Sequence, residues 1–201
     1  MQSKNKLLIA TSNKNKVREI KHILGRRFRP IVLKNPPRIN ENGRTLEENA
    51  VKKAKGFFRV AKITTLADDT GLEVAKLGGL PGVRSARFAG KNCSYADNNA
   101  KLLRVLEGAP FRERKAKFVT VVSLIFPDGN IRAVSGEARG YILTRPRGTN
   151  GFGYDPLFYY PPLGKTFAEM TTGEKNSISH RGRALLKAKR ILEKYVYVRK
   201  A

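Results

Sequence analysis

Residues 6–16 read KLLIATSNKNK, a short buried strand followed at once by the start of a helix. The apolar run at 7–10 suits a strand with both faces covered. Ser12 or Asn13 can cap the helix, and Gly25 can end it. The apolar residues of this helix share one face: Val17, Ile20, Ile23 and Leu24. The stretch therefore predicts a strand–helix unit, the element from which α/β folds are built.

The alternation of strands and helices continues along the chain. Helices are expected at 45–61, 95–106 and 179–195, and strands at 6–11, 30–33, 64–67, 118–126, 131–134 and 136–143. The turn sequence PDGN at 127–130 joins two of the strands and predicts an antiparallel hairpin. Residues 147–156 are too rich in glycine for regular structure. We therefore expect a mixed sheet in a three-layer α/β fold, and one domain over 1–201.

The composition limits the class of protein. The 201 residues are 40% hydrophobic, which is enough for a sizeable core despite the high charge. The single cysteine, Cys93, excludes a disulfide framework and a multi-cysteine zinc site. No apolar run approaches the roughly 18–20 residues that span a bilayer, and the run at 7–10 is too short for a signal peptide. We therefore expect a cytoplasmic protein with no membrane partner.

The charge is strongly basic, with 41 Lys and Arg against 16 Asp and Glu and a net charge of +25. Residues 1–60 hold 16 basic and 4 acidic side chains, whereas residues 61–100 hold 5 and 4. The nearly neutral segment contains the adjacent Asp68 and Asp69. A basic excess predicts a polyanionic partner, either nucleic acid, a phosphorylated small molecule or an anionic surface. The alternative is a solubility trait with no specific partner.

The junction between the first strand and its helix is a candidate anion site. A helix start offers free backbone N–H groups and the positive end of the helix dipole. Short polar side chains and two lysines surround it: Thr11, Ser12, Asn13, Lys14, Asn15 and Lys16. The glycines and the GK[ST] ending of a Walker A loop are missing. A well-capped, exposed helix start is the alternative interpretation.

The sequence Asp68-Asp69-Thr70-Gly71 follows a predicted strand, where α/β folds place catalytic groups. Two adjacent carboxylates in so basic a chain indicate a hard metal ion or a general base. Glu41, in the loop before the second helix, can supply a further oxygen ligand. A simple turn is the alternative, because Asp and Gly both favour turns.

Two later segments complete the candidate residues. GFGYDP at 151–156 combines a flexible backbone with Phe152, which can stack on a base, and Asp155, which can bond a base edge. Packing of these aromatic rings into the core is the alternative. KNSISHR at 175–181 places Arg181 in the first turn of the last helix, where a cation opposes the dipole, so a ligand role is favoured. His22 and Cys93 carry no such signal.

Together the segments resemble the inosine/xanthosine triphosphate pyrophosphatase family over residues 7–192. The matching motifs are T-x-N-x-x-K at 11–16, TLEENAxxKA at 45–54, ADDTGLEV at 67–74, LGGLPGVRSARFAG at 77–90, GFGYDPLF at 151–158, KTFAEM at 165–170 and EKNSISHRG at 174–182. Each motif alone is modest, but seven in order at the expected spacing are a strong signal.

The resemblance implies a long twisted mixed sheet flanked by helices, two lobes with a central nucleotide-binding cleft, and a homodimer. It implies hydrolysis of ITP, dITP and XTP to the monophosphate and pyrophosphate, with Mg²⁺. Residues 11–16 would hold the triphosphate, and Thr70 would touch the substrate. Glu41 and Asp69 would bind Mg²⁺, and Asp69 would also accept the proton of the attacking water. The nucleotide pocket would be lined by Phe152, Gly153, Tyr154, Asp155, Lys175, His180 and Arg181.

Two alternatives remain open at the level of sequence. The same chemistry could act on modified pyrimidine or methylated nucleotides. The net charge of +25 also exceeds what the resemblance leads us to expect, so non-specific nucleic-acid binding is the runner-up from another functional class.

Overall fold

The elements of the chain follow the predicted alternation. The structure, a computed structural model, describes residues 5–198. Its helices are α1 (Lys14–Leu24), α2 (Leu46–Ala61), α3 (Tyr95–Val105), α4 (Thr172–Ile178) and α5 (His180–Val198). Its strands are β1 (Asn5–Ile9), β2 (Phe28–Ile31), β3 (Thr65–Val74), β4 (Pro81–Gly82), β5 (Lys115–Ile125), β6 (Ile131–Ile142), β7 (Phe158–Tyr160) and β8 (Lys165–Thr166). None of the helices in this range combines the length and hydrophobicity that a membrane crossing needs.

The eight strands form one mixed sheet in the order β2-β1-β3-β5-β6-β7-β8, with β4 paired to β3. β1 pairs in parallel with both β2 and β3. β7 pairs antiparallel with β6 and with β8. The predicted mixed α/β fold is therefore confirmed.

The chain divides into two compact units. Among the described residues, unit 1 comprises 5–69, 120–136 and 181–198, and unit 2 comprises 70–119 and 137–180. The predicted central cleft stays a prediction, as does a single domain over the whole chain.

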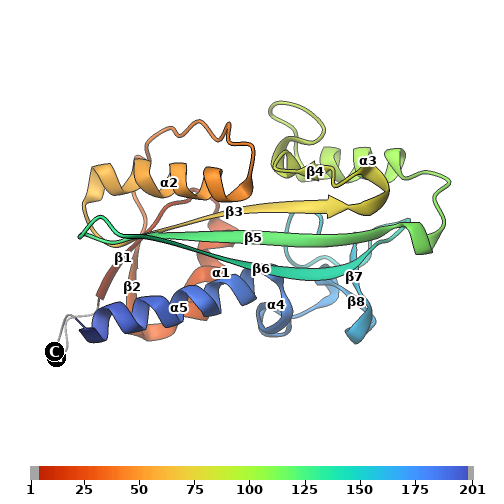
Figure 1. Ribbon diagram of the computed structural model, residues 1–201. Coiled ribbons are helices and arrows are strands. Elements are labelled where there is room, and N and C mark those ends of the chain that lie inside the picture. The colour runs from red at the N-terminus through yellow and green to blue at the C-terminus, as the bar shows by residue number, and fades with distance from the viewer. Residues whose placement is uncertain (1–4, 199–201) are drawn as a thin grey trace. The chain divides into compact units, whose positions relative to one another are not determined.

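Unit 1 has three layers, which follow from the alternation of side chains along its strands. Leu7 and Ile9 of β1 pack into a core with the apolar faces of α1 and α5. Leu8, between them, packs on the opposite face with Ala54 and Phe57 of α2. Figure 1 shows α2 on one side of these strands and α1 and α5 on the other. The carboxyl end of β1 thus leads directly into the helix layer.

Unit 2 has its own core, built around aromatic rings. Phe118 of β5 packs against Phe158 of β7 and Phe167, with ring centroids 4.8 and 6.0 Å away. Leu102 and Leu106 close this core from the side of α3. Tyr154 of the loop at 151–156 packs into this same core.

Three elements differ from the sequence predictions. β3 was expected to end at Ala67, but it continues through the two aspartates to Val74. β6 is one strand of 12 residues, not two strands broken at Ser135. α4 was not predicted; it ends at Ile178, and α5 begins two residues later at His180. Hydrogen bonds along the sheet sustain strands through polar residues that by themselves would favour turns.

Candidate functional site

The amino end of α1 is organised by Asn13, one of its two predicted caps. The Asn13 Oδ1 accepts hydrogen bonds from the backbone N–H groups of Asn15 (2.9 Å) and Lys16 (3.3 Å). The backbone N–H of Asn13 in turn donates to the Thr11 Oγ1 (3.2 Å). Ser12 and Lys14 are exposed at the same turn. The loop therefore has a fixed shape, with positive charge at its surface and the positive end of the helix dipole behind it.

Lys16 points inward, to the first aspartate of β3. Its Nζ lies 3.0 Å from the Asp68 Oδ2, and the Arg181 Nε donates to the same oxygen at 3.2 Å. Burial opposes ionisation of the Asp68 carboxyl, but Lys16, Arg181 and Lys53 outweigh it and hold the pKa of Asp68 well below its usual range. Asp68 is therefore a permanent anion in the interior of unit 1.

Lys53 enters the same region from α2. It is buried, and its Nζ lies 2.8 Å from the Glu41 Oε2 and donates to the backbone oxygen of Asp68 at 3.0 Å. Burial opposes its charge, yet Asp68, Glu41 and Asp69 raise the pKa of Lys53 above its ordinary value. Lys53 thus links the loop of Glu41 to the aspartate pair as a cation.

Asp69, the next residue of β3, has the opposite electrostatic character. Burial is the largest influence and raises the pKa of Asp69. Lys53 and Lys16 lower it, but the neighbouring Glu41 and Asp68 raise it further. A carboxylate whose pKa is raised is a better proton acceptor than an ordinary aspartate, which is the property a general base needs.

The residues that hold Arg181 include one that the sequence prediction missed. The buried Glu19 of α1 accepts a hydrogen bond from the Arg181 Nη1 at 2.6 Å. Burial opposes the charge of Arg181, but Glu19 and Asp68 together raise its pKa above the already high value of arginine. These contacts place Arg181 in the charged cluster of unit 1, and its predicted contact with the purine stays a prediction.

The loop at 151–156 in unit 2 folds around the carboxylate of Asp155. The Asp155 Oδ2 accepts a hydrogen bond from the backbone N–H of Phe152 at 2.7 Å and lies 2.6 Å from the Lys175 Nζ. Gly151 has φ +77°, and a Cβ there would collide with this carboxylate. Both charged partners are buried, so the glycine, the loop and the ion pair define one rigid arrangement.

Aromatic side chains of the same loop in unit 2 contact Lys175 and the core. The Lys175 Nζ lies 4.9 Å from the centroid of the Phe152 ring, a cation–π distance. The hydroxyl of Tyr154 donates to the backbone oxygen of Ser85 (2.9 Å), and burial raises its pKa, so Tyr154 anchors the loop to the core. The amide of Asn99 donates to the Gly153 oxygen (3.1 Å).

His180 is buried among the aromatic rings of unit 2. Its ring stacks on Phe118, with centroids 4.4 Å apart and an interplanar angle of 14°. It lies nearly parallel to Phe167 as well, 5.9 Å away. The stacking fixes the orientation of the imidazole at the start of α5.

The predicted residues thus fall into two groups. In unit 1 the structure brings Lys16, Asp69 and Arg181 into one charged cluster, with Glu41 linked to it through Lys53. In unit 2 it brings Phe152, Asp155 and Lys175 together, with Gly153 and Tyr154 in the same loop and His180 on the aromatic core. Thr70 is the first residue of unit 2, directly after Asp69. The functional roles of these residues stay predictions.

Two charged residues of unit 1, Glu19 and Lys53, escaped the sequence prediction. Lys53 lies on the apolar face of α2, three residues after Ala50 and four before Phe57. Glu19 precedes the buried Ile20 and follows Lys16 by three residues. A charged side chain at a core position of an amphipathic helix was the available signal, because such charges are rarely buried without a partner.

The oxygen ligands for a metal ion in unit 1 are few. Over residues 5–198, no group of three or more His, Cys, Asp or Glu side chains is arranged to hold a metal. Glu41 and Asp69 are close enough for Glu41 to raise the pKa of Asp69. Two carboxylates suit a hard divalent cation that takes its remaining ligands from water and phosphate oxygens.

Comparison with known proteins agrees with the resemblance, which is confirmed. The Ham1 family matches residues 7–191. A Syntrophobacter fumaroxidans protein named dITP/XTP pyrophosphatase is 51% identical over 92% of this chain and 80% of its own length, and one of that name from Geobacter sulfurreducens is 49% identical over 90% and 92%. The solved structure of the Staphylococcus aureus Ham1 protein, 38% identical, covers 95% of this chain and all of its own with a TM-score of 0.84. The chain belongs to the Ham1 family.

Proposed function

We propose that this chain hydrolyses the non-standard purine nucleoside triphosphates dITP, ITP and XTP to the nucleoside monophosphate and pyrophosphate. The observation that carries the proposal is the charged cluster of unit 1, in which a helix start, two buried cations and the partly buried Lys16 surround two adjacent aspartates of unlike pKa. Relatives that share about half of its residues are named for this reaction.

The reaction requires water to attack the α-phosphorus while pyrophosphate leaves with growing negative charge. The amino end of α1 and Lys16 bind the departing phosphates and stabilise that charge electrostatically. Asp69 accepts the proton of the attacking water, which its raised pKa favours. Asp68 keeps Lys16 and Arg181 charged and in position and takes no part in the proton transfer.

The charge balance of the cluster supports a divalent cation, and we propose Mg²⁺. Four carboxylates, of Glu19, Glu41, Asp68 and Asp69, face three cations, of Lys16, Lys53 and Arg181. The protein alone therefore has too few cations for a polyanionic triphosphate. Glu41 and Asp69 would hold the ion, which, when bound, supplies positive charge to the phosphate oxygens.

Unit 2 supplies the residues that recognise the base. Phe152 offers a ring for stacking, and the loop at 151–156 and His180 offer hydrogen-bond donors. A donor would bond the 6-keto oxygen of hypoxanthine or xanthine, whereas the 6-amino group of adenine would present a second donor. An unpaired buried donor costs about 1–3 kcal/mol, or roughly 5- to 150-fold in selectivity per contact.

The test is turnover of a nucleotide panel with Mg²⁺, with pyrophosphate and orthophosphate measured separately. We expect pyrophosphate from dITP, ITP and XTP, and much slower turnover of ATP and GTP. Release of orthophosphate, or equal rates for 6-keto and 6-amino purines, would refute the proposal. Faster turnover of modified pyrimidine or methylated nucleotides would favour the alternative substrate class.

We also propose that the enzyme is cytoplasmic and, on the basis of the family resemblance, a homodimer. Light scattering coupled to size exclusion should give twice the chain mass of 22.5 kDa. A mass of one chain at the concentrations of the turnover assay would contradict it.

A further inference from the structure

The outer helices of unit 1 carry a large share of the basic charge that the catalytic residues leave unexplained. Over 14–27 and 180–198, that is α1, the 3-10 helix η1 (Gly25–Arg27) and α5, nine basic side chains are exposed and no acidic one is. We call this set the basic layer: Lys14, Arg18, Lys21, Arg26, Arg27, Arg183, Lys187, Arg190 and Lys194. The two acidic residues of these segments, Glu19 and Glu193, pair with Arg181 and Arg27.

The α5 part of the basic layer is a single stripe. At 100° per residue, Arg183, Lys187, Arg190 and Lys194 fall within about 60° of one another around the helix and extend over about 16 Å of its length. The opposite face of α5 is buried in the core through Ala184, Leu185, Ala188 and Leu192. Packing of that face therefore directs the stripe outward.

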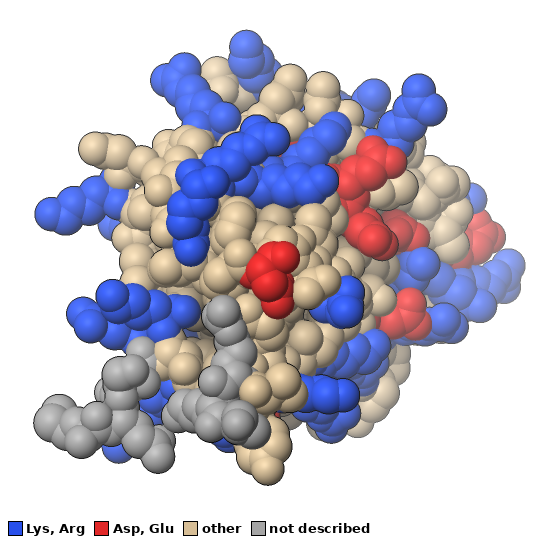
Figure 2. All heavy atoms as spheres, turned by 60° about the vertical axis from the view of Figure 1, so that its left-hand side comes forward, with Lys and Arg blue, Asp and Glu red and all other residues tan. Residues whose placement is uncertain are grey.

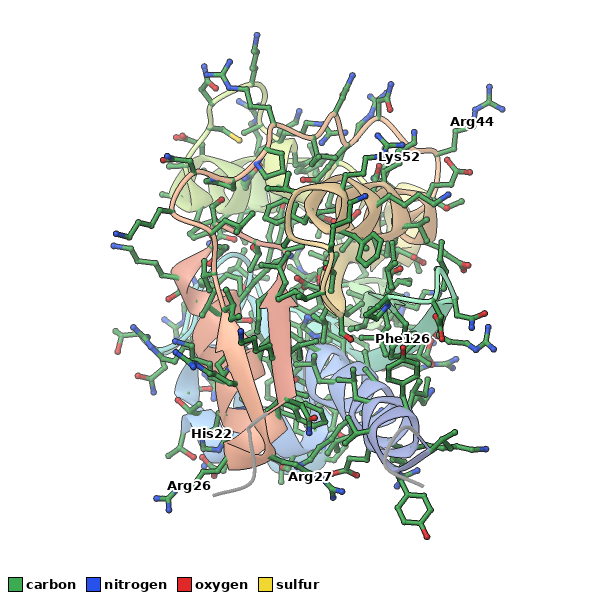
Figure 3. The ribbon with its side chains drawn as sticks, turned by 90° about the vertical axis from the view of Figure 1, so that its left-hand side faces the viewer. His22, Arg26, Arg27, Arg44, Lys52 and Phe126 are labelled. Carbon is green, nitrogen blue, oxygen red and sulfur yellow. The ribbon has the colours of Figure 1, made fainter. Side chains whose placement is uncertain are left out.

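The α1 part adjoins the stripe through direct contacts between the two elements. The Lys189 Nζ donates to the backbone oxygen of Ile23 near the end of α1 (3.2 Å), and the Arg27 Nη1 lies 3.6 Å from the Glu193 Oε1. In Figure 3, Arg26 and Arg27 lie with His22 at one end of unit 1, on the other side of the strands from Arg44 and Lys52. Figure 2 shows many more basic than acidic side chains on the visible face.

The stability of the helix itself does not account for this pattern, although the Lys187 Nζ donates to the backbone oxygen of Ser135 (2.8 Å). Like charges spaced by four residues on a helix, such as 183 with 187 and 190 with 194, destabilise it by about 0.2–0.5 kcal/mol per pair. Arg183, near the amino end of α5, also opposes the helix dipole. A surface that costs the fold stability in this way is better explained by an anionic partner.

We propose that the basic layer binds the phosphate backbone of duplex nucleic acid without regard to sequence. A duplex presents one phosphate per about 1.7 Å of axis, so several phosphates face a stripe of this length. Single strands are bound through several stacking rings, whereas the stripe offers only Tyr197 at its far end. An amphipathic helix that inserts into a membrane surface needs an exposed apolar face, and that of α5 is buried in the core.

The test uses neutral substitutions and a matched control in the same unit. The stripe variant is Lys187→Gln/Arg190→Gln/Lys194→Gln, and the control is Lys52→Gln/Lys55→Gln/Arg59→Gln on α2, which removes the same charge from the other helix layer. Binding to a fluorescent random-sequence duplex of about 20 base pairs is measured by anisotropy over a range of salt concentrations. Circular dichroism and pyrophosphate release confirm that both variants are folded.

We expect the wild-type protein to bind the duplex with a steep salt dependence. Each lost phosphate contact lowers the log–log salt slope by about 0.9, so the stripe variant should lose about 2.7 in slope and on the order of 100-fold in affinity at about 0.15 M salt. Arg190→Gln alone should produce about a third of this change in slope. Equal weakening of the control, absence of wild-type binding, or tighter binding to phosphatidylserine vesicles than to the duplex would overturn the proposal.

Discussion

The two adjacent aspartates of β3 should affect stability in opposite directions when each is replaced by asparagine. Asp68 is buried beside Lys16 and Arg181, and its pKa is lowered, so the folded state favours its charge. Asp69 has a raised pKa, because burial and two neighbouring carboxylates act against its charge. Asparagine keeps the size and shape of each side chain, removes the charge and replaces one carboxylate oxygen by an amide donor.

The expected magnitudes follow from these contacts. Removing one partner of a buried ion pair costs about 3–5 kcal/mol, because the remaining charges are left without compensation. For a chain of this length each kcal/mol corresponds to about 2–4 °C, so Asp68→Asn should lower Tm by roughly 6–20 °C. Asp69→Asn relieves an unfavourable charge and should leave Tm unchanged or raise it, while removing most turnover.

The assay is thermal unfolding by differential scanning calorimetry across pH, with Asp128→Asn in the exposed 127–130 turn as the control. The stabilisation from Asp68 is present at neutral pH and is lost only as pH falls below about 4, through its lowered pKa. The Asp69 carboxylate affects stability with the opposite sign, because its pKa is raised. Its unfavourable contribution to the stability of the fold disappears as the carboxyl protonates. The difference in Tm between Asp69→Asn and wild type should therefore shrink as pH falls. Equal loss of Tm in both variants at neutral pH would refute this assignment of the two carboxylates.

Three further substitutions test separate parts of the structure. Lys53→Met should reduce turnover and lower the affinity for the metal, because the Glu41 loop loses its ionic link to β3; unchanged metal dependence of turnover would contradict this. Gly151→Ala should raise KM more than it lowers kcat, since the added Cβ displaces the Asp155 carboxylate; an unchanged KM would show that the loop has no part in base binding. Arg114→Gln should destabilise unit 2 by about 2–5 kcal/mol without affecting substrate selectivity, because its buried guanidinium donates to several backbone oxygens; a normal denaturant midpoint would argue against it.

Much of the fold could be predicted because local signals and packing agree. The apolar run of β1 and the three- and four-residue spacing of apolar residues on α1 both match the core that they form. The side chain of Thr45 caps α2 at the backbone N–H of Glu48, which fits a helix that begins with the sequence TLEE, although the Glu48 carboxylate accepts from the backbone N–H of Arg44 and not of Thr45. Errors occurred where sheet pairing overrides local preference, as at the two aspartates that β3 carries through its middle.

The sequence predicts which segments carry the candidate site residues, but it does not predict which residues pair with one another in the fold. The sequence indicated the polar segments at 11–16, 68–71, 151–156 and 175–181, but ion pairs such as Arg181 with Glu19 join residues more than 150 positions apart. Local spacing carries no information on such pairs. A buried lysine or glutamate on an amphipathic face indicates only that a partner exists, and its identity requires the fold.

Unit 1 of this chain, whose net charge is +25, holds two distinct charge distributions. Inside unit 1, three cations face four carboxylates, so this charged cluster has no positive excess of its own to offer a triphosphate. The exposed basic layer lies on the surface of unit 1, and its nine positive charges are not part of the internal cluster. Because salt screens exposed charges far more than buried ones, added salt should abolish duplex binding while the pairing of Asp68 with Lys16 and Arg181 persists. Pyrophosphate release should therefore outlast duplex binding in a salt titration, and parallel loss of both would show that the two distributions act as one.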